Sequence, residues 1–282
     1  MDGPQVSVAF PRPGRALWAV LIAMAALGIA TALLATWAGG AGGHGAESVF
    51  TWLVYRPGEG FSQPWRLLTS GFLTNPESWG HLLFSLMGLY FLGASLERRW
   101  GPWRFLRFLA LAVVMGNLTT WAVAHAMGEG MPGRFHPAFV FGPAAAITAI
   151  AVAWAREYSD STVQLFMVLP IRGKTLLWIT VGFCVLDLVY PAGMPEGVLA
   201  PFGGLLAGLL FGGTPSLART TWLHVRLALL RRQSTSVRVG DMLARKPPRR
   251  PRPGAPPLRV VPGGLEEVLK KRTPPKDKRY LN

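Results

Sequence analysis

Three polar residues within apolar stretches are the positions where this sequence could do chemistry. His81 and Ser85 are four residues apart, so on a helix they share one face. An imidazole beside a hydroxyl could act as the base and nucleophile of a hydrolase. No third residue is identifiable to orient the imidazole, so hydrogen bonds that anchor a loop are the preferred interpretation. Asp187 either lies near the membrane interface or contacts a polar group of a bound protein or an ion.

Metal, disulfide and cofactor chemistry have little support in the sequence. Cys184 is the single cysteine of the chain, so no internal disulfide can form. The histidines are too scattered to suggest a metal site: His44, His81, His125, His136 and His224. We therefore predict no metal and no cofactor.

The elements that carry these residues are predicted to be membrane-spanning helices. Half of the chain is hydrophobic and 15% is charged, which is unusual for a soluble domain. Crossing the hydrocarbon core takes roughly 20 apolar residues. Six apolar runs approach this length, and the shorter ones imply tilt or local thinning of the bilayer: Ala16–Ala38, Gly80–Leu96, Phe108–Met127, Ala138–Ala155, Thr175–Tyr190 and Gly197–Gly213.

The first run has two interpretations, a signal peptide or an uncleaved spanning helix, and its length favours the second. Basic residues concentrate in alternate loops and in the stretch from Thr214 onward, whereas Arg56, Arg66 and Arg134 are the only ones on the other side. By the positive-inside rule, both termini lie in the cytoplasm. We therefore expect a cytoplasmic N-terminus (1–15), a membrane domain (16–213) and a cytoplasmic tail (214–282).

Two segments outside the predicted spans have distinct compositions. The first loop, 39–79, is rich in Trp, Tyr and Phe, which favours elements lying in the membrane interface. The tail carries +13 of the chain's net charge of +15. It is predicted to form an amphipathic helix near 217–232, followed by a largely disordered Pro- and Arg-rich stretch. Anionic lipid or a cytoplasmic protein is its expected partner, and no nucleic acid is expected.

Small residues mark the starts of two predicted helices. One reads Phe139-Val140-Phe141-Gly142-Pro143-Ala144-Ala145-Ala146, and the other reads Leu199-Ala200-Pro201-Phe202-Gly203-Gly204-Leu205-Leu206-Ala207-Gly208. Such residues allow helix backbones to approach closely. Gly142, Ala145, Gly204 and Gly208 are therefore predicted to serve helix packing, and both prolines suit a first turn.

These two segments resemble the helices on which rhomboid intramembrane proteases carry a Gly-x-Ser-Gly nucleophile and an Ala-His-x-x-Gly base. Ala144 stands at the serine position and Pro201 at the histidine position. Trp65-Arg66 is similar to the family's Trp-Arg element in the first loop. His81 through Ser85 resembles its His-x-x-x-Asn, with Ser85 replacing Asn, and Glu97 through Gly101 resembles its Glu-x-x-x-Gly.

The resemblance implies an all-α, six-helix membrane bundle without the catalytic dyad. In the family, the His81 and Ser85 positions support the oxyanion. Non-catalytic relatives bind transmembrane segments of client proteins as scaffolds or quality-control factors, and we expect the same here. His81, Ser85, Asp187, Trp65 and Arg66 are the candidates for shaping the client groove or anchoring the loop. The alternatives are an intramembrane serine endopeptidase with a misaligned serine, and a transporter or channel. A bacterial cytoplasmic membrane is the expected location.

Overall fold

The computed structural model describes residues 12–38, 45–127, 133–160, 162–165, 169–190 and 197–244. The chain divides into two compact units, Met1–Ala228 and Leu229–Asn282. The helical membrane domain lies in the first unit. The Pro- and Arg-rich stretch that we predicted to be disordered, 245–282, lies outside the described residues.

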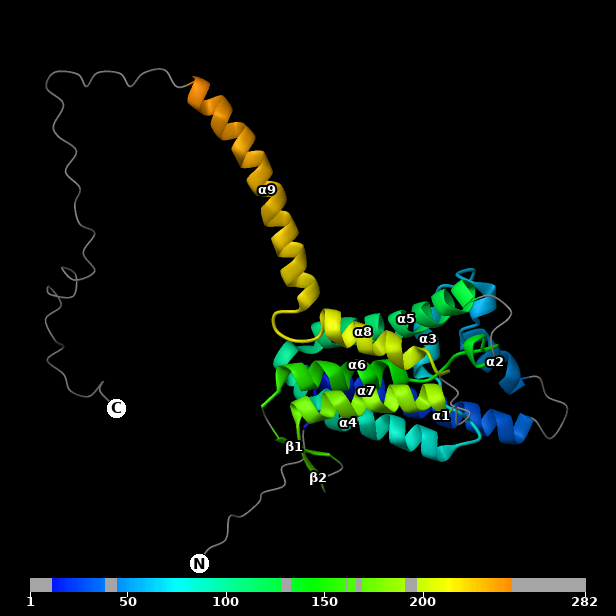
Figure 1. The fold of residues 1–282 in the computed structure, drawn as a ribbon. Helices are drawn as coiled ribbons and strands as arrows, with labels where there is room; N and C mark the ends of the chain where they lie inside the picture. Colours follow the sequence, from blue (N-terminus) through cyan, green and yellow to red (C-terminus); the bar gives the residue numbers. More distant parts are fainter. Residues whose placement is uncertain are drawn as a thin grey trace, which may run out of the picture. The chain divides into compact units, whose positions relative to one another are not determined.

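Helices occupy the positions of all six predicted apolar runs (Figure 1): α1 (Arg15–Ala38), α4 (Trp79–Trp100), α5 (Pro102–Met127), α6 (Ala144–Glu157), α7 (Gly173–Val189) and α8 (Ala200–Phe211). Only three of the described helices, α1, α4 and α5, are long and apolar enough to cross a membrane by themselves. At 1.5 Å per residue, the 14-residue α6 is about 21 Å long. The count of six spans therefore stays a prediction.

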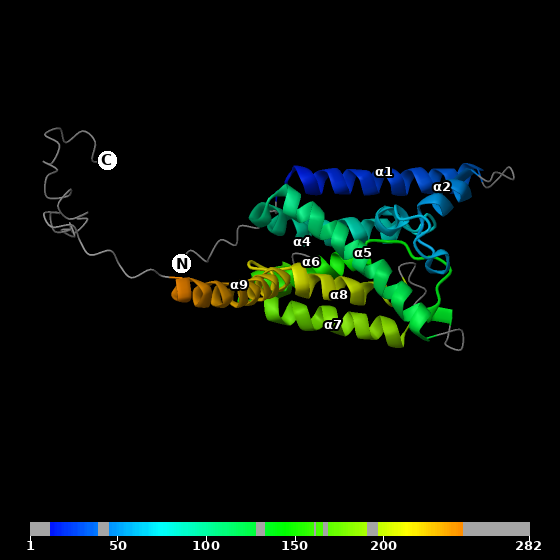
Figure 2. The same cartoon turned by 90° about the horizontal axis from the view of Figure 1, so that it is seen from above.

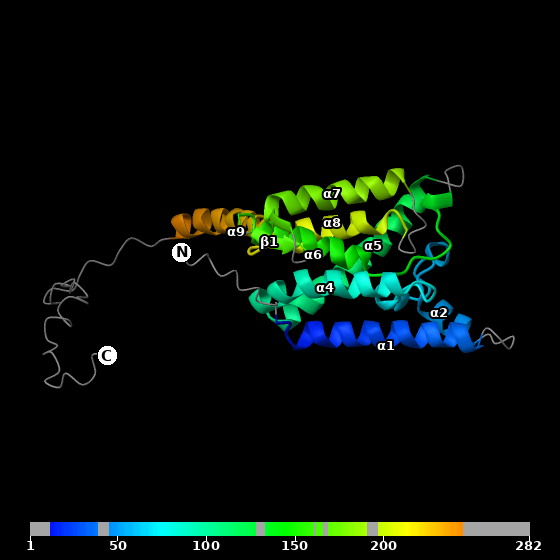
Figure 3. The ribbon, with the colours of Figure 1, turned by 90° about the horizontal axis from the view of Figure 1, so that it is seen from below.

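The short α6 lies in the middle of the bundle. Figures 2 and 3 show α1 on one flank and α7 on the other, with α6 between them. Most of α6 is buried, including Ala145, Ile150 and Val152. Backbone at membrane depth needs no full-length helix when protein surrounds it, so α6 can be short without exposing unpaired polar groups to lipid.

The flanking helices present large apolar side chains outward. On α1, Leu17 and Met24 are buried, whereas Ile22 is 61% exposed. On α7, Trp178 and Phe183 are 73% and 62% exposed. Helices that are apolar on all sides are typical of membrane spans, because lipid covers the outward face.

The first loop folds into short helices, and their predicted location in the membrane interface stays a prediction. These are α2 (Gly45–Leu53), η2 (Pro57–Glu59), α3 (Arg66–Thr69) and η3 (Ser70–Phe72). A further turn, η4 (Gly133–Phe135), precedes α6. In Figure 1 the first-loop elements lie at the end of the bundle where α6 and α8 begin.

The structure corrects the prediction at 138–143, which we expected to be helical. Helix α6 begins only at Ala144. Val140 instead forms an isolated antiparallel bridge with Tyr55 of the first loop, with N···O distances of 2.8 and 3.3 Å. Pro143 follows this bridge, and the residue before a proline is disfavoured in the helical region, so the apolar run continues as extended chain.

Two further elements differ from the prediction. A short antiparallel hairpin, β1 (Thr162–Leu165) with β2 (Leu169–Arg172), joins α6 to α7, so the fold is helical but not strictly all-α. The tail helix α9 (Leu217–Ala244) is longer than the predicted 217–232. Its residues 229–244 are the described part of the second unit.

Buried polar side chains hold the helix ends together. The carboxyl oxygens of Glu97, near the end of α4, accept the N–H groups of Ala16 at 2.9 Å and Leu17 at 3.1 Å. This carboxyl caps α1, whose first N–H groups have no partner within the helix. Arg156 of α6 donates to the carbonyls of Leu209 and Gly212, the second at 3.1 Å, and so satisfies the end of α8.

We expect Glu97→Ala to destabilise the folded domain by about 1–3 kcal/mol, because it leaves two buried N–H groups unpaired. The free energy of unfolding in detergent, measured by chemical denaturation, tests this. Glu77→Gln is the control, because Glu77 is exposed. Equal stability of the Glu97 variant and wild type would contradict the cap.

Candidate functional site

The start of α6 is set by backbone contacts with the first loop. Gly142 has a φ of 119°, a conformation that favours glycine. Its N–H donates to the carbonyl of Ser70 at 2.9 Å. Pro143 follows as the residue that caps α6, and Ala144 is the first helical residue. Ala144 is the residue that the sequence resemblance aligns with the proteases' nucleophile.

The start of α8 is also fixed by backbone hydrogen bonds. Pro201 lies in the first turn and is buried, where its missing N–H costs no helical hydrogen bond. The turn is closed by hydrogen bonds from Phe202 and Gly203 to the carbonyl of Leu199, at 3.1 and 3.4 Å. Pro201 is the residue that the sequence resemblance aligns with the proteases' histidine.

Glycines on α8 bring its backbone against α5 and α6. A Cβ on Gly204 would collide with the carbonyl of Ala145 and lie 2.8 Å from that residue's Cα. A Cβ on Gly203 would lie 2.5 Å from the Cα of Gly116. One turn on, a Cβ on Gly208 would lie 2.8 Å from the carbonyl oxygen of Ala149. No side chain fits at these glycines, so small residues here are a steric requirement.

Tyr55 closes the space above these helix starts. It forms one apolar cluster with Val140, Ala145 and Ala200, and Leu67 and Trp121 pack against that cluster. Tyr55 is 1% exposed, and its hydroxyl has no hydrogen-bond partner among the described residues. Burial raises the pKa of Tyr55 to about 12, so the phenol stays neutral. The sequence offered no reason to place Tyr55 at this site, because Tyr55 is far along the chain from the starts of both helices.

Trp65 and Arg66 hold the first loop together. The Nε of Arg66 donates to the carbonyl of Trp52 at 3.1 Å, and its Nη1 donates to Glu59 at 2.7 Å. Trp65 donates to the same carbonyl at 3.3 Å. A hydrogen bond from Arg56, together with the charge of Arg66, lowers the pKa of Glu59. Of the two roles predicted for Trp65 and Arg66, the contacts correspond to loop anchoring.

Asn117 is a contact that the sequence reasoning missed. Its amide nitrogen donates to the carbonyl of Leu67 and to the hydroxyl of Ser70, both at 2.8 Å. Asn117 lies on α5 and is 3% exposed. A buried amide that bonds a loop in this way fixes α3 and η3 on the bundle. The sequence offered one indication of this contact, because Asn117 is a polar residue within an apolar run.

His81 and Ser85 are on the first turns of α4, and a hydrogen bond of His81 disfavours a catalytic pair. The Nδ1 of His81 accepts the backbone N–H of Asn75 at 2.9 Å. In the neutral imidazole the proton is therefore on Nε2, which cannot then take a proton from a hydroxyl. His81 holds the turn before α4. Ser85 is 4% exposed, within the bundle.

Asp187 lies in the last turn of α7 and is half-buried. The buried Cys184 lies one turn earlier on the same helix. Across the described part of the chain, no group of three or more His, Cys, Asp or Glu residues could hold a metal ion.

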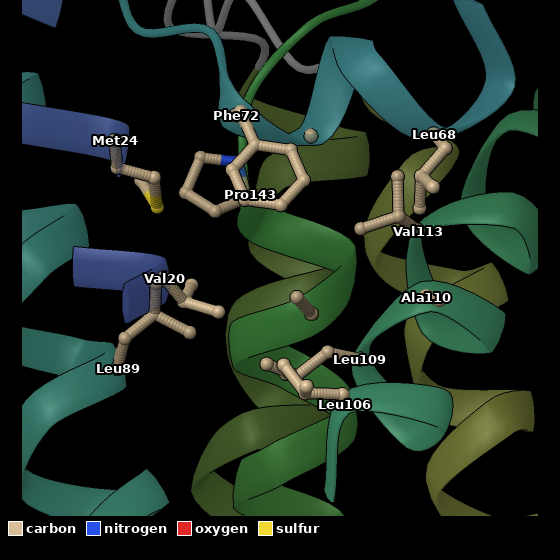
Figure 4. Close-up of a pocket in the computed structure, with 12 residues that line it drawn as sticks. Val20, Met24, Leu68, Phe72, Leu89, Leu106, Leu109, Ala110, Val113 and Pro143 are labelled. Atoms are coloured by element: carbon tan, nitrogen blue, oxygen red, sulfur yellow. The ribbon is translucent and has the colours of Figure 1, made fainter. Parts of the chain in front are cut away.

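An apolar cavity of about 220 Å³ lies beside the start of α6 (Figure 4). Val20 and Met24 of α1 line one side, and Leu106 and Leu109 of α5 line the other. Pro143 forms part of its wall, and Phe72 and Leu68 of the first loop lie at its upper end. No charged side chain lines it, so an apolar cavity of this kind can take an apolar group.

The fold defines a multi-pass helical membrane protein, and its candidate site lies where α6 and α8 begin, next to the first loop. The rhomboid domain model matches residues 61–216. This chain belongs to the rhomboid family.

Two curated relatives support this membership. The chain is 29% identical over 167 residues to the rhomboid protease GlpG of Pectobacterium atrosepticum, covering 59% of this chain and 54% of that protein. It is also 29% identical over 155 residues to the mitochondrial RHOMBOID-like protein 12 of Arabidopsis thaliana, covering 52% of this chain and 43% of that protein. The chain thus spans about half the length of the curated relatives it matches.

We expect Gly204→Ala to destabilise the domain by about 1–3 kcal/mol, because the added methyl overpacks the contact with the Ala145 backbone. Thermal unfolding of the purified protein in detergent measures the effect. Gly182→Ala on α7 is the matched control, because a Cβ there meets nothing within 4 Å. If both variants unfold like wild type, the close approach of α6 and α8 is wrong.

Proposed function

We propose that this protein binds transmembrane segments of other membrane proteins without cleaving them. The observation that carries the proposal is the residue pair at the two helix starts, Ala144 and Pro201. Peptide hydrolysis by a serine mechanism needs a hydroxyl nucleophile, a base and oxyanion donors. In a soluble serine protease, loss of the nucleophile alone costs about 10⁶ in kcat. The methyl group of Ala144 cannot serve as the nucleophile, and the pyrrolidine ring of Pro201 cannot serve as the base.

The packing around Ala144 and Pro201 supports a role in binding. Glycine contacts still fix α8 against α6, and Asn117 still fixes the first loop. At 1.5 Å per residue, the 12-residue α8 is about 18 Å long, compared with roughly 30 Å of hydrocarbon. A short helix favours local thinning of the bilayer. A thinned, partly polar region stabilises a client helix that is itself poorly stable in lipid.

We propose that Ser85, within the bundle, and Asp187, in the last turn of α7, form the polar part of the client-binding region. Trp65 and Arg66 form hydrogen bonds within the first loop, and His81 forms one in the turn before α4. We propose that these three shape the binding region indirectly, by positioning the loop above it. The location proposed for this activity is a bacterial cytoplasmic membrane.

The tail helix is proposed to contact anionic lipid or a cytoplasmic partner. Trp222, Val225 and Leu229 of α9 are all more than half exposed. Arg226 lies over the ring of Trp222 at 5.1 Å. Exposed apolar side chains next to cations are typical of helices that bind membrane surfaces or partner proteins.

The rival function is intramembrane serine proteolysis, because one relative is named a rhomboid protease. A fluorophosphonate probe separates the two, since labelling requires an activated serine. We expect no labelling of the purified protein under conditions that label an active rhomboid protease. Stoichiometric labelling would replace the binding function with proteolysis.

A photo-crosslinking amino acid at Ala144 tests client binding directly. We expect it to capture transmembrane segments of other proteins, identified by mass spectrometry. The matched control is the same amino acid at Trp178, which is 73% exposed on the outer face of α7. Capture of lipid alone at Ala144, or identical protein adducts at both positions, would contradict the proposal.

A further inference from the structure

A hollow of about 610 Å³ lies at the other end of the bundle, where α4 ends and α5 begins. Trp100 and Trp103 form its walls together with Arg104 and Arg107 of α5. Phe211, the last residue of α8, closes another side. This end carries the arginine-rich turns that the positive-inside rule assigns to the cytoplasm.

The hollow is positively charged. Arg104 lies over the ring of Trp100 at 4.6 Å and donates to the carbonyl of Gly213 at 2.7 Å, so its guanidinium is held in place. Arg107 is exposed and forms no hydrogen bond or ion pair with any residue that the structure describes. No Asp or Glu lines the hollow. An anion is the complementary ligand, because arginine matches phosphate in both charge and geometry.

The carboxylates nearest to this end do not neutralise these arginines. Glu97 is occupied by the first N–H groups of α1. Glu157 forms an ion pair with Arg99 and accepts from the hydroxyl of Thr214 at 2.8 Å. The positive charge of Arg107 is therefore left for a ligand from outside the chain.

The wall of the hollow changes from polar to apolar along α5. Trp103 is 73% exposed, as is typical of tryptophans at the depth of lipid headgroups. Arg107 follows one turn deeper and Leu111 another turn deeper. From residue 104 to residue 111 the helix rises about 10 Å. A cation followed along the wall by apolar side chains matches a phosphate joined to an acyl chain. A soluble anion would contact only the arginines and not the deeper, apolar part of the hollow.

We propose that this hollow binds one anionic phospholipid of the phosphatidylglycerol type. Arg104 and Arg107 bind the phosphate, Trp103 packs beside the glycerol backbone, and an acyl chain lies along Leu111 and Phe211. Basic pockets between membrane helices on the cytoplasmic side are the expected places for such lipids. The site is separate from the helix starts at Ala144 and Pro201, so it does not depend on the proposed function.

Native mass spectrometry of the full chain in a neutral detergent tests the proposal, with separate titrations of phosphatidylglycerol and phosphatidylcholine. We expect one tight phosphatidylglycerol adduct and weaker phosphatidylcholine binding. Arg107→Gln should raise the Kd for phosphatidylglycerol about fivefold, which corresponds to about 1 kcal/mol for one arginine near the membrane surface. Arg107→Lys should restore much of the affinity.

Arg98→Gln is the matched control, because Arg98 is an exposed arginine at the same end of α4 that does not line the hollow. It should bind phosphatidylglycerol like wild type. An equal loss in both Gln variants would show general surface charge and overturn the site. Equal Kd values for the two lipids would do the same, as would full displacement of the lipid by soluble glycerol phosphate.

Discussion

The close approach of α8 to α5 and α6 is the contact on which the rest of the domain depends. Gly203 faces α5, while Gly204 and Gly208 face α6. Because lipid tails are as apolar as leucine, helices in a membrane gain little from hydrophobic burial and depend on van der Waals packing. Glycine allows the backbones themselves to make that packing. The two candidate positions, Ala144 and Pro201, lie at the helix starts that this contact brings together.

Polar side chains then fix the parts that packing alone leaves free. Glu97 joins α4 to α1, Asn117 joins α5 to the first loop, and Arg156 joins α6 to α8. Each satisfies backbone or hydroxyl groups that would otherwise lack a partner within the domain. The first loop is thereby held above α6 and α8, where Tyr55 packs against Ala145 and Ala200. These contacts form a framework around the helix starts at Ala144 and Pro201.

Much of the helical framework could be predicted from the sequence, because apolar runs and small residues are local signals. The run 138–155 was misread at its start, since Phe139, Val140 and Phe141 look helical until a strand-like partner is known. That partner, Tyr55, is in the first loop. The polar contacts were also out of reach, because Glu97 and Ala16 are 81 positions apart and Asn117 and Ser70 are 47 apart. Pairing over such separations depends on tertiary structure, which one sequence does not reveal.

The guanidinium of Arg156 has a consequence for how this bundle can move. It ties the last carbonyls of α8 to α6, while glycine packing fastens the opposite end of the same two helices. Because α6 and α8 are joined at both ends, we expect them to move as one rigid body. If a client helix binds as proposed, it would therefore enter by displacement of an outer helix, α1 or α7, while α6 and α8 stay in place.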